Sequence, residues 1–264
     1  MTDPNARLEL PRALCTITAG ARWQRVTIGE SGAAVFRLQY AHGAQHYLKI
    51  APDRLAEDLE QELRRLQWLA DRAPVPRVLA FTQQQAASYL LTLAVPGLNA
   101  AEPQIIARPA RLVQLLATGL RLLHALPIDD CPFNHGMDAE IARARQHLEQ
   151  GLVDEADFDD ARAGWSAHDL FGELLATRPS SEDRVLTHGD YCLPNVLSDD
   201  GQLSGFVDLG RAGIGDPHRD LALAARSIRR NVGAEWVAPF FEAYGLESPD
   251  PAKLAFYQLL DEFF

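Results

Sequence analysis

The chain has 264 residues, a hydrophobic content of 47% and a formal net charge of −11 at pH 7. This length suits one large domain or two lobes, and the acidic balance argues against nucleic acid as a partner and favours cationic ligands. Apolar runs stay well short of the roughly 20 residues that cross a membrane, and the charged N-terminus lacks the apolar segment of a secretory signal. We therefore expect a cytoplasmic protein, a monomer or weak dimer, with no membrane partner.

Three cysteines are scattered along the chain, at Cys15, Cys131 and Cys192. An odd number at wide spacing fits neither a disulfide framework nor a zinc cluster, so we expect free thiols. We expect Cys192 to be a small filler rather than a nucleophile, because no activating base is evident near it in the sequence.

The first 95 residues alternate β-rich runs with turn signals. Three runs predict strands that are connected by short turns, a helical segment follows over residues 53–71, and two more strand-like runs come after it. The strand-like runs are "WQRVTI", "AAVFRLQYA", "AQHYLKI", "RVLAF" and "SYLLTLA". This pattern predicts a small β-rich lobe over residues 1–95.

The pattern changes near Pro96 and Gly97, where a mainly helical half begins. Helices are predicted over residues 109–126, 137–150 and 167–177, and again from about residue 218 to the end. Short β-type runs, "RVLT", "NVL" and "LSGFVDLG", interrupt the helical half. We therefore predict an α+β fold with two lobes, the second over residues 96–264.

The segment "THGDYCLPNVLSDDGQLSGFVDLG" carries the strongest chemical signal. His188, Asp190 and Asn195 have the spacing of the protein-kinase catalytic loop, and Asp208 precedes Leu-Gly where kinases have Asp-Phe-Gly. Phosphoryl transfer needs a carboxylate that accepts the proton of an attacking hydroxyl, and hard oxygen ligands for Mg²⁺. We assign Asp190 as the catalytic base, Asn195 and Asp208 as Mg²⁺ ligands, and ATP as the phosphate donor. Each residue alone would be an ordinary turn former, but their order and spacing favour the functional interpretation.

Lys49 ends the third predicted strand, where kinases carry the lysine that holds the α- and β-phosphates. The next helix has an apolar face with spacings of three and four, formed by Leu55, Leu59, Glu62, Leu66 and Leu69. Glu62 is a carboxylate within this buried face, and a buried charge needs a partner. We therefore predict that Lys49 pairs with Glu62, whereas Glu60 lies off this face and is a solvated residue.

Two further segments are candidates for nucleotide binding. "GESGAA" lies in the turn between the first two strands, where Ser31 and nearby backbone N–H groups could cap a phosphate, although its glycines do not match G-x-G-x-x-G. Ala94 and Val95 lie at the junction of the lobes and could offer backbone groups to an adenine edge. The second assignment is positional.

Acidic residues gather in two places in the helical half. They are Asp157, Asp159 and Asp160 in the loop "GLVDEADFDD", and Asp261 and Glu262 in the final helical turn before Phe264. Negative charge at a helix C-terminus is unfavourable by typically a few tenths of a kcal/mol, and a cationic ligand would offset this cost. A solvated turn that caps a helix and a fraying terminus would explain the same residues without a function.

Together these residues resemble the aminoglycoside 3′-phosphotransferases, antibiotic-resistance enzymes with a protein-kinase-like fold. The resemblance runs over nearly the whole chain, from "AAVFRL" through "CPF", "IARARQHLEQGLVD", "THGDYCLPN" and "GFVDLGR" to "AFYQLLDEFF". It implies transfer of the ATP γ-phosphate to the 3′-hydroxyl of a kanamycin- or neomycin-type aminoglycoside, and hence resistance.

The resemblance also implies roles for single residues. Lys49 and Glu62 match the family's phosphate-positioning pair, Ser31 matches its nucleotide loop, and Asp220 matches a buried acid that braces the catalytic loop. The positions that match the family's aminoglycoside pocket are Asp157, Asp159, Asp160, Arg211, Arg226, Asp261, Glu262 and the carboxylate of Phe264.

The chain departs from the family at two positions of this pocket. Close members tend to have carboxylates where this chain has Ser227 and Arg230, which weakens the expected pocket for polycations but leaves the phosphoryl-transfer residues unchanged. Two alternatives remain open: a kinase of another small hydroxylated cation such as choline, and a non-catalytic protein that binds nucleotide or aminoglycoside.

Overall fold

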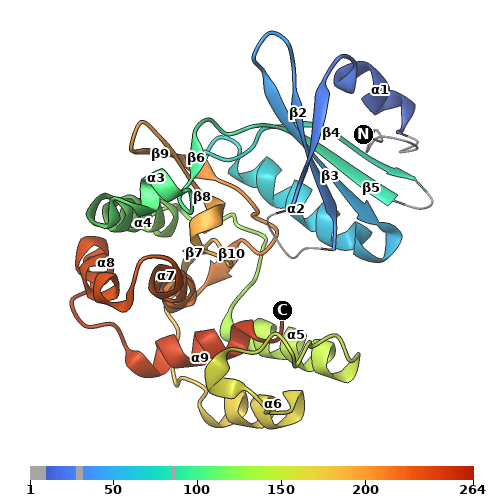
Figure 1. Ribbon diagram of the computed structural model, residues 1–264. Coiled ribbons are helices and arrows are strands. Elements are labelled where there is room, and N and C mark those ends of the chain that lie inside the picture. Colours follow the sequence, from blue (N-terminus) through green and yellow to red (C-terminus); the bar gives the residue numbers. More distant parts are fainter. Residues whose placement is uncertain (1–9, 28–31, 85–86) are drawn as a thin grey trace. The chain divides into compact units, whose positions relative to one another are not determined.

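The computed structural model describes residues 10–27, 32–84 and 87–264, except for the side chains of Arg54 and Asp160 (Figure 1). The chain forms two compact units, Met1–Val95 and Pro96–Phe264. The first is built on an antiparallel sheet and the second is mainly helical, so the predicted α+β class is confirmed.

The first unit contains a five-stranded antiparallel sheet in the order β1-β2-β3-β5-β4. Its strands are β1 (Arg22–Val26), β2 (Ala34–Gln39), β3 (Gln45–Pro52), β4 (Val78–Gln84) and β5 (Ala87–Leu93). Each corresponds to one of the predicted β-rich runs. The strand order follows from consecutive hairpins, except that β5 inserts between β3 and β4.

Helices cover both faces of this sheet. On one face, Leu14 of α1 (Arg12–Thr18) packs in a core cluster with Phe36, Leu48 and Leu91, which occupy paired positions in β2, β3 and β5. Successive strand residues point to opposite faces, so Lys49 of β3 points the other way, toward α2 (Ala56–Leu69). A short 3₁₀ turn, Asp53–Leu55, precedes α2, so the helical segment predicted over residues 53–71 is present with slightly shorter bounds.

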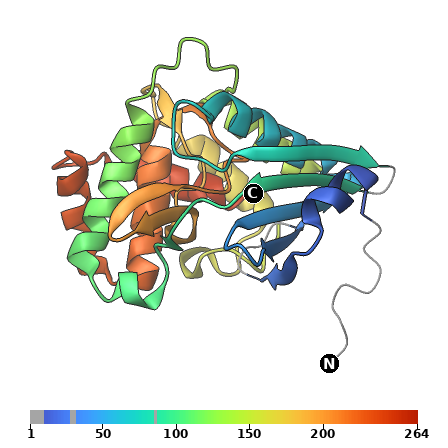
Figure 2. The same ribbon diagram turned by 90° about the horizontal axis from the view of Figure 1, so that it is seen from above.

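The second unit is built from helices of very different lengths. They are α3 (Pro103–Ile106), α4 (Pro109–His124), α5 (Met137–Glu149), α6 (Ala167–Ala176), α7 (Pro217–Asn231), α8 (Val237–Tyr244) and α9 (Pro251–Asp261), with 3₁₀ turns at Asp160–Arg162, Leu193–Asn195 and Ala234–Trp236. Figure 2 shows α4 (green) beside α7 (orange), and α9 packs against α7. A core cluster formed mainly by α5, α6, α9 and the residues after α9 includes Leu170, Phe256 and Phe263.

Two small sheets within this unit carry the loops of the kinase-like motif. Strands β7 (Val185–Thr187) and β10 (Gly213–Gly215) form an antiparallel pair, and β6 (Leu98–Asn99), β8 (Val196–Asp199) and β9 (Gln202–Phe206) form a three-stranded sheet in the order β6-β8-β9. Within the described residues, no helix is both long and apolar enough to cross a membrane.

Candidate active site

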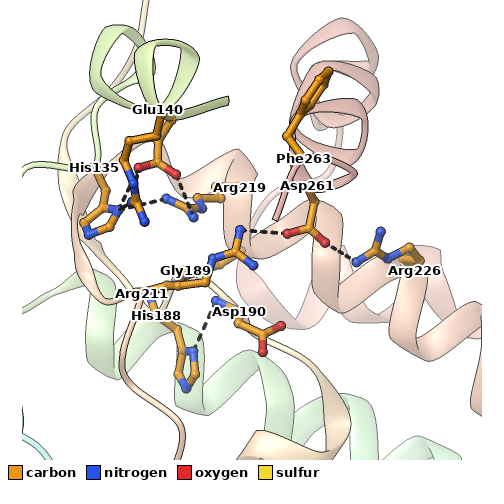
Figure 3. A network of polar contacts seen from close by, with 12 residues as sticks. His135, Glu140, His188, Gly189, Asp190, Arg211, Arg219, Arg226, Asp261 and Phe263 are labelled. Carbon is orange, nitrogen blue, oxygen red and sulfur yellow. Dashed lines mark hydrogen bonds and ion pairs between the residues drawn. The ribbon is translucent and has the colours of Figure 1, made fainter. Parts of the chain in front are cut away.

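The catalytic-loop motif connects β7 to β8 and is internally hydrogen-bonded. The amide nitrogen of Asn195 donates to the Asp190 carboxylate at 2.9 Å and to the Asp190 carbonyl at 3.0 Å. The Asp190 N–H donates to Nδ1 of His188 at 3.3 Å, as Figure 3 shows. A neutral His188 ring then carries its proton on Nε2, which donates to the carbonyl of Val207 at 3.1 Å. His188 therefore connects the Asp190 loop to the segment that carries Asp208.

Gly189 is required by the shape of this loop. Its φ is +84°, a conformation that side chains disfavour, and a Cβ atom placed there would lie 2.0 Å from the carbonyl oxygen of Arg211. The close approach brings the Asp190 loop against the backbone of Arg211. The glycine between His188 and Asp190 thus has a packing reason as well as a conformational one.

Asp220 on α7 holds the loop from beneath. Its carboxylate is completely buried and accepts hydrogen bonds from the N–H groups of His188, at 2.7 Å, and Gly189, at 2.8 Å. Nε2 of His124 on α4 lies 3.2 Å from the same carboxylate, and Nδ1 of His124 lies 2.8 Å from the Tyr244 hydroxyl. Burial alone would raise the pKa of Asp220, but His124 and His188, through their hydrogen bonds and charges, together outweigh it and hold that pKa below its ordinary value. An ionised carboxylate therefore braces the loop from α7, in the position that the resemblance implied.

Asn195 and Asp208 fit the requirements of a magnesium ion. Because the Asn195 amide nitrogen faces Asp190, its amide oxygen is turned away from that carboxylate. Asp208 follows β9 with φ +61°, one of two positive φ values among the described non-glycine residues. No cluster of three or more His, Cys, Asp or Glu side chains in the described part of the chain could hold a metal ion. One carboxylate and one amide oxygen suit Mg²⁺, which usually completes its coordination with phosphate oxygens and water.

Lys49 and Glu62 form an ion pair within the first unit. Nζ of Lys49 lies 2.7 and 2.8 Å from the two carboxylate oxygens of Glu62. Glu62 is buried on the apolar face of α2, whereas Glu60 pairs with Arg64 on the exposed face at 2.5 Å. The pairing that the helical spacing predicted is therefore present, and it holds the ammonium group against α2. Strand β3 continues to Pro52, so Lys49 lies within the strand rather than at its end as predicted.

The other two predicted nucleotide segments are described in part. Ser31 lies outside the described residues. The N–H of Ala94 donates to the carbonyl of Gln45 at 3.0 Å, so a nucleotide base would have to use other backbone groups of Ala94 and Val95.

The acidic C-terminal turn is paired with arginines of the chain itself. The carboxylate of Asp261 contacts Arg211 at 2.8 Å and also contacts Arg226, as Figure 3 shows. Burial would raise the pKa of Asp261, but the two guanidinium groups outweigh it and lower the pKa. The charge that opposes the α9 dipole is thus offset within the protein.

Asp159 and Glu262 extend this arrangement. Arg162 lies 3.5 Å from the Asp159 carboxylate and 2.9 Å from the Glu262 carboxylate. Arg226 lies 3.9 Å from Asp159, and Arg230 forms a further ion pair with Asp159. We call these seven side chains the acid–arginine cluster; its members are Asp159, Asp261, Glu262, Arg162, Arg211, Arg226 and Arg230.

Three further residues that the resemblance assigned to the pocket are Phe264, Asp157 and Asp160. The ring of Phe264 lies 5.0 Å from the guanidinium carbon of Arg211. Asp157 is exposed in the loop before Asp159, and the Asp160 side chain lies outside the described residues. In the same loop, Glu155 caps α6 by accepting from the N–H of Ala167 at 2.8 Å, so the structural interpretation of the acidic loop holds for that residue.

Sequence reasoning missed the partners of several site residues. The contacts of His124 with Asp220 and of Arg162 with Glu262 span 96 and 100 residues of the chain, so neither had a local signal. The longer contact of Arg162 with Asp159, three residues before it, is local. Cys192 behaves as predicted, since burial raises the pKa of its thiol strongly. None of the three cysteines forms a disulfide.

Glu262 should make stability depend on pH. Burial and the negative charge of Asp159 raise the pKa of Glu262 from 4.5 to about 7. The folded state therefore holds this proton more tightly than the unfolded state, and the stability that Glu262 contributes is lost as pH rises from about 4.5 through 7. Relative to wild type, Glu262→Gln should gain about 1–2 kcal/mol of unfolding free energy between pH 5 and pH 8.

Urea unfolding at four pH values across this range would measure the change. The exposed Glu173→Gln substitution on α6 is the control and should track wild type. A constant difference between Glu262→Gln and wild type at every pH would contradict the prediction.

Comparison with known proteins places this geometry in a family. The model of the phosphotransferase enzyme family matches residues 22–257. The aminoglycoside 3′-phosphotransferase of Streptomyces fradiae is 43% identical over 254 residues, which cover 92% of this chain and 95% of that protein. Residues 22–257 span parts of both units and contain the whole segment from His188 to Gly210.

Solved structures agree with the sequence comparison. The crystal structure of an aminoglycoside-3′-phosphotransferase of type VIII matches with a TM-score of 0.87 and 38% identity, covering 96% of this chain and 97% of that chain. The aminoglycoside phosphotransferase APH(3″)-Id of Streptomyces rimosus, solved with ADP and streptomycin, matches with a TM-score of 0.81 and 30% identity, covering 95% of each chain. The chain therefore belongs to the aminoglycoside 3′-phosphotransferases of the phosphotransferase enzyme family.

Proposed function

We propose that this protein transfers the γ-phosphate of ATP to the 3′-hydroxyl of a kanamycin- or neomycin-type aminoglycoside and thereby confers resistance. The observation that carries the proposal is the catalytic loop: the Asp190 carboxylate is oriented by Asn195, on a backbone that the buried Asp220 holds. The choice of substrate is supported by relatives that are named aminoglycoside 3′-phosphotransferases and match nearly the whole chain.

Asp190 is the group that acts on the acceptor. Its carboxylate would accept a hydrogen bond from the 3′-hydroxyl and take the proton as the hydroxyl oxygen attacks the γ-phosphorus. The bond from that phosphorus to the bridging oxygen breaks, and ADP leaves. Positioning and electrostatic stabilisation account for such catalysis, so no covalent enzyme intermediate is needed.

The nucleotide and its magnesium ion would be bound by Lys49, Glu62, Asn195 and Asp208. Lys49, held by Glu62, would contact the α- and β-phosphates. Asn195 and Asp208 would hold Mg²⁺, which when bound neutralises charge on the phosphates. Ser31 and the backbone of Ala94 and Val95 remain candidates for contacts with the phosphates and the adenine, respectively.

An ADP-release assay with Mg·ATP tests the proposal. Kanamycin should be turned over, and tobramycin, which lacks the 3′-hydroxyl, should release ADP no faster than the background. Choline and streptomycin complete the panel. Turnover of choline alone would favour a metabolite kinase, and turnover of streptomycin alone would favour the activity suggested by the Streptomyces rimosus relative. If none of these acceptors stimulates ADP release but nucleotide or aminoglycoside still binds, the non-catalytic alternative would be favoured.

A further inference from the structure

The acid–arginine cluster begins beside the catalytic base. The backbone of Arg211 lies against the Asp190 loop at Gly189. Figure 3 shows the Arg211 side chain between Asp261 and Asp190. Burial would lower the pKa of Arg211, but the negative charges around it, including those of Asp261 and Asp190, raise it. From Asp261 the contacts continue through Arg226 to Asp159. An acceptor whose hydroxyl lies at Asp190 would therefore have this cluster next to it.

The cluster contains no carboxylate without a cation beside it. Three carboxylates, of Asp159, Asp261 and Glu262, contact four guanidinium groups, of Arg162, Arg211, Arg226 and Arg230. Ammonium groups of an acceptor would thus have to compete with cations that the protein already supplies. This differs from an open acidic pocket, which would attract each ammonium group without competition.

Arg230 differs from the other three arginines in its exposure. The side chain of Arg230 is 62% exposed, compared with 25% for Arg211, 21% for Arg226 and 16% for Arg162. Exposed ion pairs contribute little to folding, because water screens them and the long side chain loses entropy. Arg230 can therefore be changed with little effect on the fold, yet its charge faces Asp159.

The rest of this part of α7 supplies no compensating acid. Ser227, one turn before Arg230, is buried, and its hydroxyl accepts a hydrogen bond from the N–H of Leu193 at 3.0 Å. Ser227 therefore supports the catalytic loop. Asp159 is then the carboxylate that the positive charge of Arg230 most directly offsets.

We propose that Arg230 is a specificity-determining residue that competes with acceptor ammonium groups for Asp159 and so disfavours acceptors with additional positive charge remote from the phosphorylated hydroxyl. This inference rests on the proposed function and deepens it. It assigns the enzyme a preference for the less charged members of the aminoglycoside class. Charge at such a rim position acts mainly on encounter and affinity, so the effect should be on KM and leave kcat unchanged.

Ribostamycin and neomycin B form a suitable pair of acceptors. Neomycin B is ribostamycin with one more sugar, which carries two further amino groups, and both have the same 3′-hydroxyl. The measured quantity is the ratio of kcat/KM for neomycin B to that for ribostamycin. Relative to wild type, Arg230→Ala should raise this ratio about threefold and Arg230→Glu about tenfold. High salt should reduce both increases, and the increase for Arg230→Glu should be reduced more.

Arg229 provides the matched control. It is exposed and adjacent on the same helix, and Arg229→Glu changes the net charge by the same amount as Arg230→Glu. The Arg229 variant should keep the wild-type ratio. A second control places Arg230→Ala in an Asp159→Asn background, where the gain should disappear because the competing carboxylate is gone.

The possible results distinguish failure of the proposed function from failure of the role of Arg230. If wild type turns over neither acceptor, the proposed function fails, and this inference falls with it. If wild type turns over both acceptors but the Arg230 variants keep the wild-type ratio, or Arg229→Glu raises it equally, the role of Arg230 is refuted while the proposed function stands.

Discussion

Replacement of Asp190 by alanine or asparagine is expected to lower kcat for the aminoglycoside by about 10²- to 10⁴-fold, the range for loss of a general base. Asparagine is the sharper test because it keeps the side-chain volume and can still accept the hydrogen bond from Asn195, which reaches the wild-type carboxylate at 2.9 Å. What it loses is the ability to accept the hydroxyl proton. The expected defect is therefore in kcat.

Single-turnover phosphate transfer and calorimetric binding of nucleotide and acceptor would together make this measurement. Binding should change by less than about threefold in both variants, and the unfolding free energy should fall by about 1 kcal/mol, the contribution of one hydrogen bond, in Asp190→Ala, which loses the bond from Asn195. Asp199→Ala, an exposed carboxylate at the end of β8, is the control and should keep wild-type turnover. A kcat within tenfold of wild type for Asp190→Asn would remove Asp190 from the role of base.

The elements that the sequence predicts well are those with a local periodic signal. The apolar face of α2 identified Glu62 as buried, and from this its ion pair with Lys49 followed. Helices α4, α5 and α6 begin at their predicted residues and end within two residues of the predicted ends, because their apolar spacing is continuous. The region predicted as helical from about residue 218 contains α7, α8 and α9, whose separate bounds were not predicted.

Short elements were missed because tertiary contacts define them. The sequence of α1, "RALCTIT", contains β-branched residues and forms only a short helix, which is stabilised by Leu14 packing against the sheet. Strand β10 contains two glycines in three residues, and its pairing with β7 decides its conformation. Neither element had a pattern that a reading of the sequence alone could separate from a loop.

The charges of the site were predicted as residue types but not as pairs. The acidic C-terminal turn suggested a position where a cationic ligand would offset the helix dipole, yet Arg211 and Arg226 already do so for Asp261. These arginines lie 50 and 35 residues before Asp261 in the chain. Ion pairs over such separations depend on how α9 packs against α7, which carries Arg226, and against the segment before β10, which carries Arg211. Periodicity does not encode this packing.

Asp220 shows why the catalytic loop depends on a residue that does not contact substrate. Two backbone N–H groups of the loop, those of His188 and Gly189, are satisfied by this one buried carboxylate. Loss of an acceptor in a buried position leaves each donor without its partner and costs more than an exposed hydrogen bond. The loop and the fold should therefore fail together when Asp220 is changed.

Asp220→Ala is expected to lower the unfolding free energy by about 3–5 kcal/mol, the range for removing one partner of a buried charged network. Asp220→Asn should cost about 1–3 kcal/mol, because one amide oxygen can still accept while the amide nitrogen faces a backbone donor. In the asparagine variant, which should still fold at low temperature, kcat should fall at least tenfold, since a small displacement of Asp190 is enough to misalign it.

Urea unfolding and steady-state turnover at 10 °C would measure the unfolding free energy and kcat of both variants. The exposed Asp138→Asn substitution on α5 is the control and should shift stability by less than about 0.5 kcal/mol. Wild-type turnover in Asp220→Asn would show that the loop keeps its geometry without the carboxylate, and the hydrogen bonds to His188 and Gly189 would then be dispensable for catalysis.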